Sequence, residues 1–260
     1  KKVNFIYKNL FYEKNFINFK SFLIEDFKSD IILKSECYMK EIYLIRHGQA
    51  SFGSKNYDNL SKKGEIQSKL LGSYFKKISL NFNKVICGSL NRQIQTTKHL
   101  VEELDSQETI ESSNLLNEYN VKSVLEAYIG KRKFTEKEIS DEQVHFNLLK
   151  NAVTAWCEDN ISGEADETWS DFQKRGINFL NKCKNISAEK IAVISSAGTI
   201  SMIIAQILNL QSHHFVNFHL LLYNSSFSKI ILDGSEIKLS LFNCISHLEE
   251  SNEKQIITNV

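Results

Sequence analysis

The chain has 260 residues, a formal net charge of +1 and five scattered cysteines. This length allows one well-buried core or two small domains. The near-neutral charge argues against a nucleic-acid partner, and no apolar run approaches the ~18 residues of a membrane helix, so we expect no membrane partner either. Because the cysteines are odd in number and lack a Cys-x-x-Cys pair, they indicate neither a disulfide framework nor zinc, and we expect a cytoplasmic protein.

Residues 1–38 differ from the rest of the chain, because they are rich in Phe, Asn and Lys without a clear period. The two methionines are Met39 and Met202, and a strand-like run directly follows Met39. We interpret Met39 as the native start and residues 1–38 as a non-native or dispensable N-terminal extension. A genuine helical arm is the alternative, because five apolar residues fall near helical spacing. These are Phe16, Phe19, Phe22, Leu23 and Phe27.

The first core element is an apolar run at residues 41–46, which is typical of a buried strand. It stops at Arg46, His47 and Gly48. In α/β proteins, ligands bind at the carboxyl ends of strands. An arginine there can bind a phosphate group, and a histidine can attack phosphorus as a nucleophile. A strand end with two polar surface residues is the alternative that this segment alone leaves open.

Helical and strand-like segments alternate through the rest of the chain. Ser61 and Thr168 are predicted to cap helices. The expected helices are 62–77, 90–104, 121–128, 141–159, one that starts after Thr168, and 198–208. The expected strands are 84–87, 109–111, 190–195, a hairpin of 219–223 with 227–232, and 237–243. This alternation predicts an α/β fold, a three-layer α/β/α sandwich with a mostly parallel central sheet.

Three polar motifs follow one another in a set order. They are Arg46-His47-Gly48, Leu60-Ser61-x-x-Gly64-x-x-Gln67 and Ser89-Leu90-x-Arg92-x-x-x-Thr96. In this order they resemble the histidine phosphatase superfamily, which includes the cofactor-dependent phosphoglycerate mutases and many phosphomonoesterases. The longer opening at 46–53, Arg-His-Gly-Gln-Ala-Ser-Phe-Gly, is similar to the opening of a bacterial subgroup of small members of this superfamily. The resemblance spans 39–248 and implies a phosphoglycerate mutase-like domain at 39–260, a lid at about 118–165, and chemistry that needs no metal and no other cofactor.

His47 is the candidate nucleophile. A neutral imidazole nitrogen attacks phosphorus to give phosphohistidine, which water later hydrolyses. The Gly48 carbonyl could hold the other ring nitrogen and fix the tautomer. Arg46 and Arg92 are the candidate phosphate clamps, because planar guanidinium groups stabilise a phosphoryl group in transfer. The alternatives are a hydrogen-bonded turn histidine and a solvated helix arginine.

Glu118 is the candidate general acid. It occupies the position equivalent to the Leu-x-Glu site of the superfamily, where a carboxylic acid protonates the leaving alkoxide. The like charge of a nearby phosphate would raise its pKa and so suit it to that role. Glu111 and Glu126 are rivals by proximity alone.

Ser196 marks a departure from the superfamily pattern. Most members carry a second histidine after the third core strand, and the loss of one such donor typically costs ~3 kcal/mol. The Ser196 hydroxyl and the following helix N-terminus could return part of that stabilisation. Three further residues, Gln49, Ser51 and Asn56, are candidate donors to phosphate or substrate. Asn224 and His247 match late superfamily positions and are expected to be structural.

The sequence therefore predicts a phosphomonoester hydrolase, a histidine phosphatase that acts through phosphohistidine on a small phosphorylated substrate. The alternative is a catalytically weak phosphate-binding or regulatory pseudo-phosphatase. A phosphoglycerate mutase is less well supported, because a mutase must keep its phosphoenzyme dry and bind two phosphates. The chain could also form a homodimer.

Overall fold

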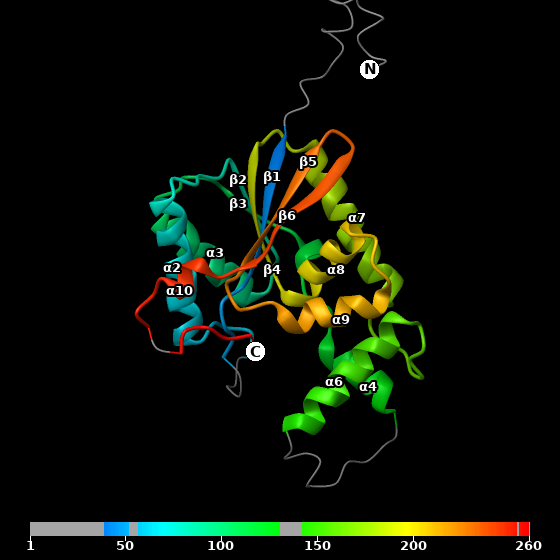
Figure 1. Ribbon diagram of the computed structural model, residues 1–260. Coiled ribbons are helices and arrows are strands. Elements are labelled where there is room, and N and C mark those ends of the chain that lie inside the picture. The colour runs from blue at the N-terminus through cyan, green and yellow to red at the C-terminus, as the bar shows by residue number, and fades with distance from the viewer. Residues whose placement is uncertain (1–38, 52–56, 131–141, 254, 260) are drawn as a thin grey trace, which may run out of the picture. The chain divides into compact units, whose positions relative to one another are not determined.

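The computed structural model describes residues 39–51, 57–130, 142–253 and 255–259 (Figure 1). The chain divides into two units, Lys1–Tyr38 and Met39–Val260, and all described residues belong to the second. The predictions for residues 1–38 and for Asn56 therefore lie outside the described residues. No helix in the described part of the chain is both long and apolar enough to cross a membrane.

In the described part of the chain, six strands form one sheet in the order β3-β2-β4-β1-β5-β6. Their bounds are β1 (Lys40–Arg46), β2 (Lys84–Cys87), β3 (Ile110–Ser112), β4 (Lys190–Ser195), β5 (Phe227–Asp233) and β6 (Glu236–Cys244). The four strands β3, β2, β4 and β1 are parallel, whereas β5 and β6 are antiparallel additions. This confirms the mostly parallel sheet. Arg46 lies opposite Ser195 in the β1–β4 register, so the carboxyl ends of these two strands meet at one edge of the sheet.

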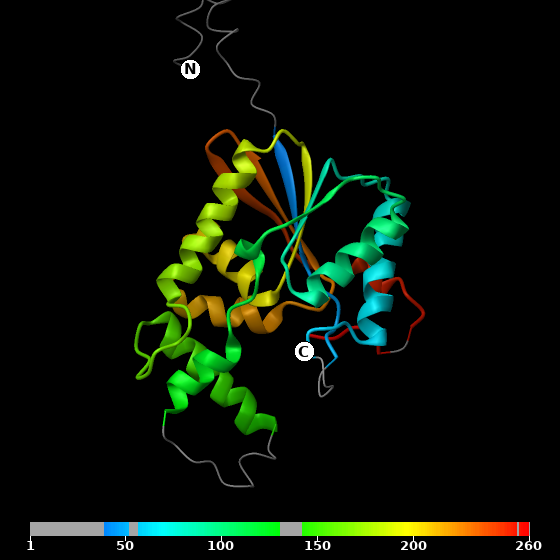
Figure 2. The ribbon, with the colours of Figure 1, turned by 180° about the vertical axis from the view of Figure 1, so that it is seen from behind.

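Helices cover both faces of this sheet. On one face lie α2 (Lys62–Lys77), α3 (Asn91–Glu103) and α10 (Ser246–Glu249), and on the other lie α7 (Trp169–Asn185), α8 (Ala197–Ile207) and α9 (Ser212–Leu221) (Figures 1 and 2). Alternate residues of β1 enter the two cores: Tyr43 and Ile45 pack on the α2 side, and Ile42 and Leu44 on the α7 side. Side chains alternate along a strand, so one buried strand supplies both cores. The predicted three-layer sandwich is confirmed.

The predicted helix caps are present. The Ser61 Oγ accepts a hydrogen bond from the Gly64 amide at 3.1 Å, and the Thr168 Oγ1 accepts one from the Asp171 amide at 3.1 Å. Each hydroxyl satisfies a first-turn amide that has no partner within its helix. Ser61 thereby fixes where α2 begins.

One predicted element was wrong. Residues 219–223 were expected to form a strand paired with 227–232, but residues up to Leu221 belong to α9, and β5 instead forms a hairpin with β6. Phe215 and Val216 are the buried residues of α9. The apolar run at 220–222 fits a strand and the end of a helix equally well, so periodicity could not separate them. The hairpin turns at Gly234, whose φ of 59° is a conformation that favours glycine.

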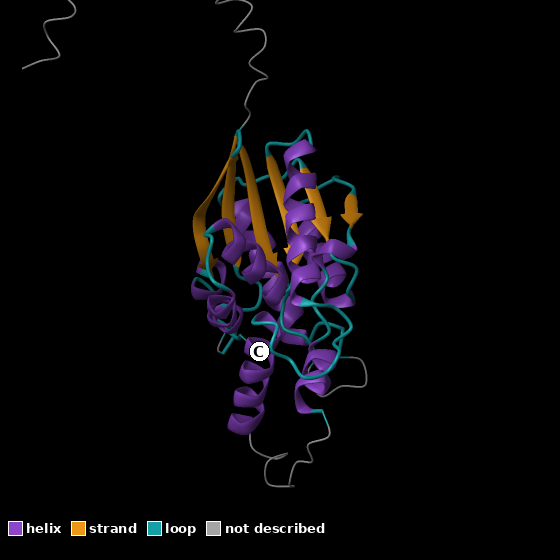
Figure 3. Ribbon diagram, turned by 90° about the vertical axis from the view of Figure 1, so that its right-hand side faces the viewer, coloured by secondary structure: helices purple, strands orange, loops and turns teal. Residues whose placement is uncertain are grey.

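The segment between η1 (Asn114–Leu116) and α7 contains the helices α4 (Val121–Ile129) and α6 (Glu142–Cys157), as the sequence predicted. They lie beyond the carboxyl ends of the parallel strands, toward which the strand arrows point (Figure 3). The α6 helix contacts α9 and α4. This segment between η1 and α7, which we call the insertion, therefore lies at the end of the sheet where the polar motifs gather.

Candidate active site

His47 directly follows β1, and its two ring nitrogens have different partners. Nδ1 lies 2.7 Å from the Gly48 carbonyl oxygen, and Nε2 lies 3.1 Å from the Arg92 Nε. Arg92 can only donate, so Nε2 is the unprotonated nitrogen and Nδ1 carries the proton. Burial is the main cause that lowers the pKa of His47 well below its usual value, and the positive charges of Arg92 and Arg46 lower it further. The ring is therefore neutral at neutral pH, with a lone pair on Nε2.

The backbone around His47 is held on both sides. Its amide donates to the Ser195 carbonyl at 3.0 Å, and its carbonyl accepts from the Ser225 amide at 3.2 Å. The Gly48 amide donates to the Thr96 Oγ1 at 3.0 Å, which explains why a threonine of α3 belongs to the third motif. These contacts hold the His47 backbone between β4, the turn that precedes β5, and α3.

The first two motifs touch each other. A Cβ at Gly48 would collide with the Gly64 carbonyl, and a Cβ at Gly64 would collide with the Gln49 backbone. The Gln49 amide donates to the Gln67 Oε1 at 2.8 Å, and the Gln49 Oε1 accepts from the Ser61 Oγ at 2.9 Å. In these contacts Gln49 ties the loop after β1 to the start of α2. Its predicted role as a phosphate donor stays a prediction.

Ser51 has a comparable place in this loop. Its Oγ donates to the Leu60 carbonyl at 2.8 Å, and its amide donates to the Asn59 carbonyl at 2.8 Å. Both contacts join the loop after β1 to the residues that precede α2. The prediction that Ser51 binds substrate likewise stays a prediction.

Arg46 is buried, and one side of its guanidinium is already occupied. Nη1 donates to the carbonyls of Leu222 and of Asn259, the latter at 3.0 Å. Burial lowers the pKa of Arg46 to about 10, which leaves it charged at neutral pH. Its Nε is buried without a hydrogen-bond partner among the described residues. A buried donor of this kind calls for an acceptor, and a phosphate oxygen would supply one.

Arg92 lies in the first turn of α3, and Asp58 orients its side chain. The sequence motifs did not point to Asp58. The Arg92 Nη1 forms an ion pair with the Asp58 carboxylate, whose other oxygen accepts from the Asn91 amide at 2.7 Å. The Tyr57 ring lies 5.9 Å from the Arg92 Cζ. Asp58 precedes the second motif by two residues, so its position beside that motif was the available signal.

Glu118 follows η1 and faces the start of α8. Its Oε2 accepts from the Gly198 amide at 2.8 Å, and its Oε1 accepts from the Tyr119 amide at 3.2 Å. Burial raises the pKa of Glu118 above its usual value, although the two amides and the charges of Arg92 and Arg46 oppose this shift. A raised pKa suits a general acid. The structure thus brings Glu118 into the electrostatic surroundings of both predicted clamps.

The two rival carboxylates lie elsewhere. Glu111, on β3, forms ion pairs with Lys84 and Lys182, and these lysines lower its pKa. Glu126 forms an exposed ion pair with Lys122 at 3.6 Å on α4. Neither shares a contact with His47, Arg46 or Arg92 among the described residues.

Ser196 is buried at the N-terminus of α8, directly after β4. Its Oγ accepts from the Gln93 Nε2 at 2.9 Å, and the same amide nitrogen donates to the Leu116 carbonyl at 3.1 Å. The neighbouring Ser195 Oγ donates to the Leu116 carbonyl at 2.7 Å. Gln93 therefore holds the Ser196 hydroxyl in place at the start of α8. Gln93 directly follows Arg92 in the third motif, and this position could have indicated that it belongs to the site.

A histidine that the motifs did not indicate lies close to this group. His219, on α9, has its Nδ1 3.5 Å from the Tyr119 hydroxyl and stacks on Phe215. Burial, and then the charge of Arg46, lower the pKa of His219 to about 3. It is a neutral imidazole next to the residue that follows Glu118. No motif spacing connects residue 219 to residue 119, so the sequence offered no signal for it.

The C-terminal residues contact Arg46 and the start of α2. The Gln67 Nε2 donates to the Ile256 carbonyl at 2.7 Å and to the Thr258 Oγ1 at 2.9 Å. Thr258 in turn donates to the Asn224 Oδ1 at 2.8 Å, and its carbonyl accepts from the Asn224 amide. With the Asn259 carbonyl on Arg46, these contacts define the docked tail, residues 255–259. Asn224 thus serves as a tether in the scaffold.

His247 also has a scaffold contact. Its Nε2 lies 2.8 Å from the Ser225 Oγ, and the Ser225 amide donates to the His47 carbonyl. Burial lowers the pKa of His247 to about 3, so the ring is neutral. Elsewhere, His213 and His214 lie side by side near the exposed start of α9. Across the described ranges, no group of three or more His, Cys, Asp or Glu residues could hold a metal ion.

A family model described as "Histidine phosphatase superfamily (branch 1)" matches residues 42–245. The chain therefore belongs to the histidine phosphatase superfamily, a superfamily of enzymes. The matched range includes His47, Arg92 and Glu118.

Sequence and structure comparisons identify similar proteins. The chain is 22% identical over 225 residues to "Putative phosphoserine phosphatase 2" of Hydrogenobacter thermophilus, a match that covers 82% of this chain and 99% of that protein. Among solved structures it resembles a phosphoserine phosphatase mutant from Entamoeba histolytica in complex with phosphoserine (TM-score 0.58, 16% identity, 80% of this chain and 99% of that one). It also resembles a phosphoglycerate mutase from Bacillus anthracis (TM-score 0.56, 17% identity, 84% and 98%). These likenesses establish the phosphoglycerate mutase-like fold.

Proposed function

We propose that this chain is a phosphomonoester hydrolase that acts through a phosphohistidine at His47. The observation that carries the proposal is the different state of the two imidazole nitrogens: the Gly48 carbonyl holds Nδ1–H, and the unprotonated Nε2 accepts a hydrogen bond from the Arg92 guanidinium. A neutral, pre-oriented ring is what nucleophilic attack on phosphorus requires.

The reaction would proceed in two steps, phosphorylation of His47 and then hydrolysis of the phosphohistidine. In the first, Nε2 attacks phosphorus, the ester P–O bond breaks, and Glu118 gives its proton to the leaving oxygen. In the second, the Glu118 carboxylate takes a proton from water, the water oxygen attacks phosphorus, and the N–P bond breaks to release inorganic phosphate. His47 and Glu118 return to their starting protonation states. The raised pKa of Glu118 supports both its acid and its base roles.

Arg46 and Arg92 would hold the equatorial oxygens of the phosphoryl group through both steps. The unpaired Nε of Arg46 and the Arg92 contact with His47 support this assignment. A transferring phosphoryl group keeps its charge on those oxygens, so fixed cations lower the barrier. Ser196 would add a hydroxyl in place of the second imidazole.

The substrate we propose is a small phosphorylated metabolite with a leaving alcohol, a class that includes phosphoserine. Support comes from the names of relatives: the Hydrogenobacter thermophilus protein and the Entamoeba histolytica structure both carry phosphoserine phosphatase in their names. The segment between η1 and α7, with α4 and α6, would act as the lid that selects among such substrates. We further propose membership of the Arg-His-Gly-Gln-Ala-Ser-Phe-Gly subgroup, a cytoplasmic location, a homodimer, a dispensable segment at residues 1–38, and chemistry without a metal ion.

Steady-state hydrolysis of p-nitrophenyl phosphate by the full chain, in the presence of a chelator, tests the proposal. Activity that disappears in a folded His47→Ala protein is the expected result. No activity in the full chain with p-nitrophenyl phosphate or with a panel of sugar and amino-acid phosphates would overturn it.

A second candidate function is a phosphate-binding module with little turnover. It is favoured by one observation, the replacement of the second imidazole by a serine whose hydroxyl already accepts from Gln93. Under this alternative, inorganic phosphate binds through Arg46 and Arg92 while hydrolysis stays at the background rate. Calorimetric titration with phosphate beside the hydrolysis assay separates the two candidates.

A further inference from the structure

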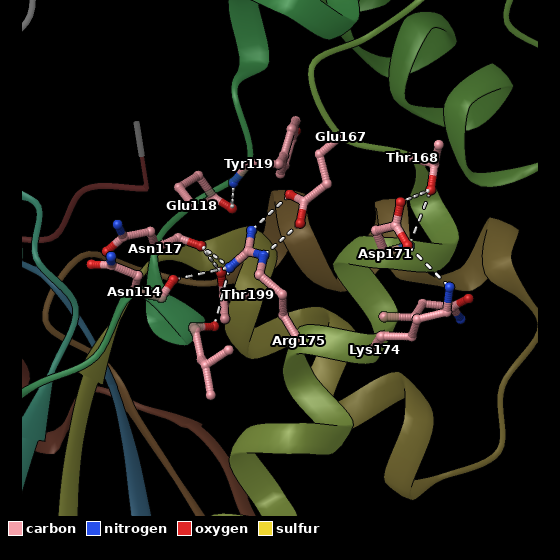
Figure 4. Close-up of polar contacts among 12 residues, drawn as sticks. Asn114, Asn117, Glu118, Tyr119, Glu167, Thr168, Asp171, Lys174, Arg175 and Thr199 are labelled. Atoms are coloured by element: carbon pink, nitrogen blue, oxygen red, sulfur yellow. Dashed lines mark hydrogen bonds and ion pairs between the residues drawn. The ribbon is translucent and has the colours of Figure 1, made fainter.

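Arg175, on α7, is held in a fixed orientation by an acid that precedes the same helix. Its Nε and Nη2 donate to the two carboxylate oxygens of Glu167 at 2.6 and 2.8 Å (Figure 4). The side chains are 19% and 23% exposed, so the pair is largely shielded from solvent. A bidentate pair of this kind fixes the plane of the guanidinium. The Phe172 ring, 4.9 Å from the Arg175 Cζ, adds a stacking contact.

The remaining nitrogen of Arg175 is directed at the backbone that leads into Glu118. Nη1 donates to the carbonyls of Leu115 at 3.1 Å and Asn117 at 2.9 Å, with a longer contact to Asn114 at 3.4 Å. Asn117 is the residue directly before Glu118. Figure 4 shows the guanidinium between the Glu167 carboxylate on one side and these carbonyls on the other.

The α8 helix completes this support. The Thr199 Oγ1 donates to the same Asn117 carbonyl at 2.8 Å, and the Gly198 amide donates to the Glu118 carboxylate at 2.8 Å. The Asn117 carbonyl therefore accepts hydrogen bonds from both α7 and α8. The Glu118 carboxylate accepts its hydrogen bond from the start of α8. A shift of this backbone would move the carboxylate off the Gly198 amide.

Arg175 also joins the two ends of the insertion. Asn117 and Glu118 precede α4, and Glu167 lies in the segment that returns from α6 to α7. The Glu167 carbonyl accepts from the Trp156 Nε1 of α6 at 2.9 Å. One guanidinium thus contacts the segment that enters the insertion and the segment that leaves it.

We propose that Arg175 is a positioning residue for the general acid, and that with Glu167 it couples the place of Glu118 to the insertion. This inference rests on the proposed phosphatase function and adds to it the residue that positions the general acid. A merely structural ion pair would change stability alone. Loss of a positioning residue must slow the reaction most for substrates whose leaving group needs a proton from Glu118.

The leaving group supplies a readout that distinguishes the two roles. p-Nitrophenolate is a stable anion and needs little protonation as it departs, whereas an alkoxide needs the proton from Glu118. The ratio of kcat/KM for an alkyl phosphate, such as glycerol 2-phosphate, to kcat/KM for p-nitrophenyl phosphate therefore reports on the general acid. A displacement of about 1 Å can cost ~10²-fold, and a general acid contributes ~10²–10⁴-fold.

The experiment measures this ratio in the full chain and in three variants. Arg175→Met is expected to lower the ratio by about 10- to 100-fold, toward the value of Glu118→Gln. Lys174→Met is the matched control: the neighbouring residue on α7 forms an ion pair with Asp171 at 3.0 Å, both side chains are more than half exposed, and neither contacts the Glu118 segment (Figure 4). It should leave the ratio unchanged.

Equal losses on both substrates in a folded Arg175→Met protein would overturn the proposal, as would a ratio equal to that of Lys174→Met. If Arg175→Met does not fold, Glu167→Gln must lower the same ratio, because it keeps the side-chain shape but removes the negative charge and replaces one of the two acceptor oxygens with a donor. A wild-type chain that hydrolyses neither substrate would count against the proposed function itself. That outcome is distinguishable from an active wild type whose variants show no leaving-group selectivity.

Discussion

The two groups proposed to transfer protons and phosphoryl have pKa values shifted in opposite directions. Burial and two arginines keep His47 neutral, whereas burial keeps Glu118 protonated to higher pH than an exposed glutamate. Both shifts favour the uncharged form of the group, a neutral imidazole that can attack and a carboxylic acid that can donate a proton. At the residue scale, these two shifts together predict how the rate depends on pH.

kcat/KM for an alkyl phosphate should fall as the pH rises through the raised pKa of Glu118, because only the protonated carboxyl can donate. His47, whose pKa is lowered, should add no rising limb near neutral pH. The measurement is a pH–rate profile corrected for the second ionisation of the substrate, beside Glu118→Gln. A falling limb that persists unchanged in Glu118→Gln would contradict this assignment.

Asp58 offers a second test at this scale, since its carboxylate orients Arg92. Asp58→Asn should lower kcat/KM by about 10- to 100-fold, because a clamp displaced by ~1 Å loses much of its effect. Steady-state kinetics check this, with Asp105→Asn as the control, because Asp105 forms an exposed ion pair with Lys76 far from the motifs. Equal kinetics in the two variants would show that Arg92 needs no orienting acid.

At the scale of elements, the site depends on how closely helix starts approach strand ends. The start of α8 receives the Glu118 carboxylate, and a Cβ at Gly198 would collide with that carboxylate and with the Tyr119 ring. Glycine here permits a close approach of backbone and acid. The same reasoning applies where Gly48 meets Gly64 at the start of α2.

Gly198→Ala should lower kcat/KM on an alkyl phosphate by about 10²-fold while Tm changes little. The displaced acid accounts for the loss, and the better helix propensity of alanine, ~1 kcal/mol, offsets part of the collision. Gly72→Ala is the control, because its Cβ would meet Glu103 between α2 and α3. It should lower Tm and leave kcat/KM unchanged, and the reverse pattern would refute the argument.

Much of the element pattern was predictable because it depends on short-range periodicity and caps. The buried run of β1, the Ser61 cap and the helices α4 and α6 were all predicted from local sequence. The hairpin was assigned wrongly because the apolar run after His219 fits either a helix end or a strand. Arg175 was not found, since its contacts with residues 115 and 117 join positions tens of residues apart and leave no periodic signal. Asp58 was missed although it lies two residues before the second motif, because periodicity does not show which arginine it pairs with.

For the molecule as a whole, the described unit joins its C-terminal residues to the candidate site by hydrogen bonds. The docked tail, residues 255–259, contacts Gln67 and Asn224 and places the Asn259 carbonyl on Arg46. The Arg46 guanidinium, the proposed phosphate clamp, is thereby held by a segment distant in sequence from β1. Substrate affinity should therefore respond to changes in the tail.

Thr258→Val removes a hydroxyl that accepts from Gln67 and donates to Asn224. KM should rise about five-fold, which corresponds to ~1 kcal/mol for a hydrogen bond, while kcat changes less because the tail does not touch Glu118 among the described contacts. Thr154→Val on α6, which removes only a bond to the Lys150 carbonyl, is the matched control. A KM equal in both variants would argue that the tail is irrelevant to binding.

The central claim is that His47 carries the phosphoryl group. Rapid alkaline quench of the full chain during turnover of a ³²P-labelled phosphomonoester, followed by peptide mapping, tests it most directly. We expect alkali-stable, acid-labile label on the peptide that contains His47, and none in His47→Ala. Turnover without label on that peptide, or label on another residue, would contradict it.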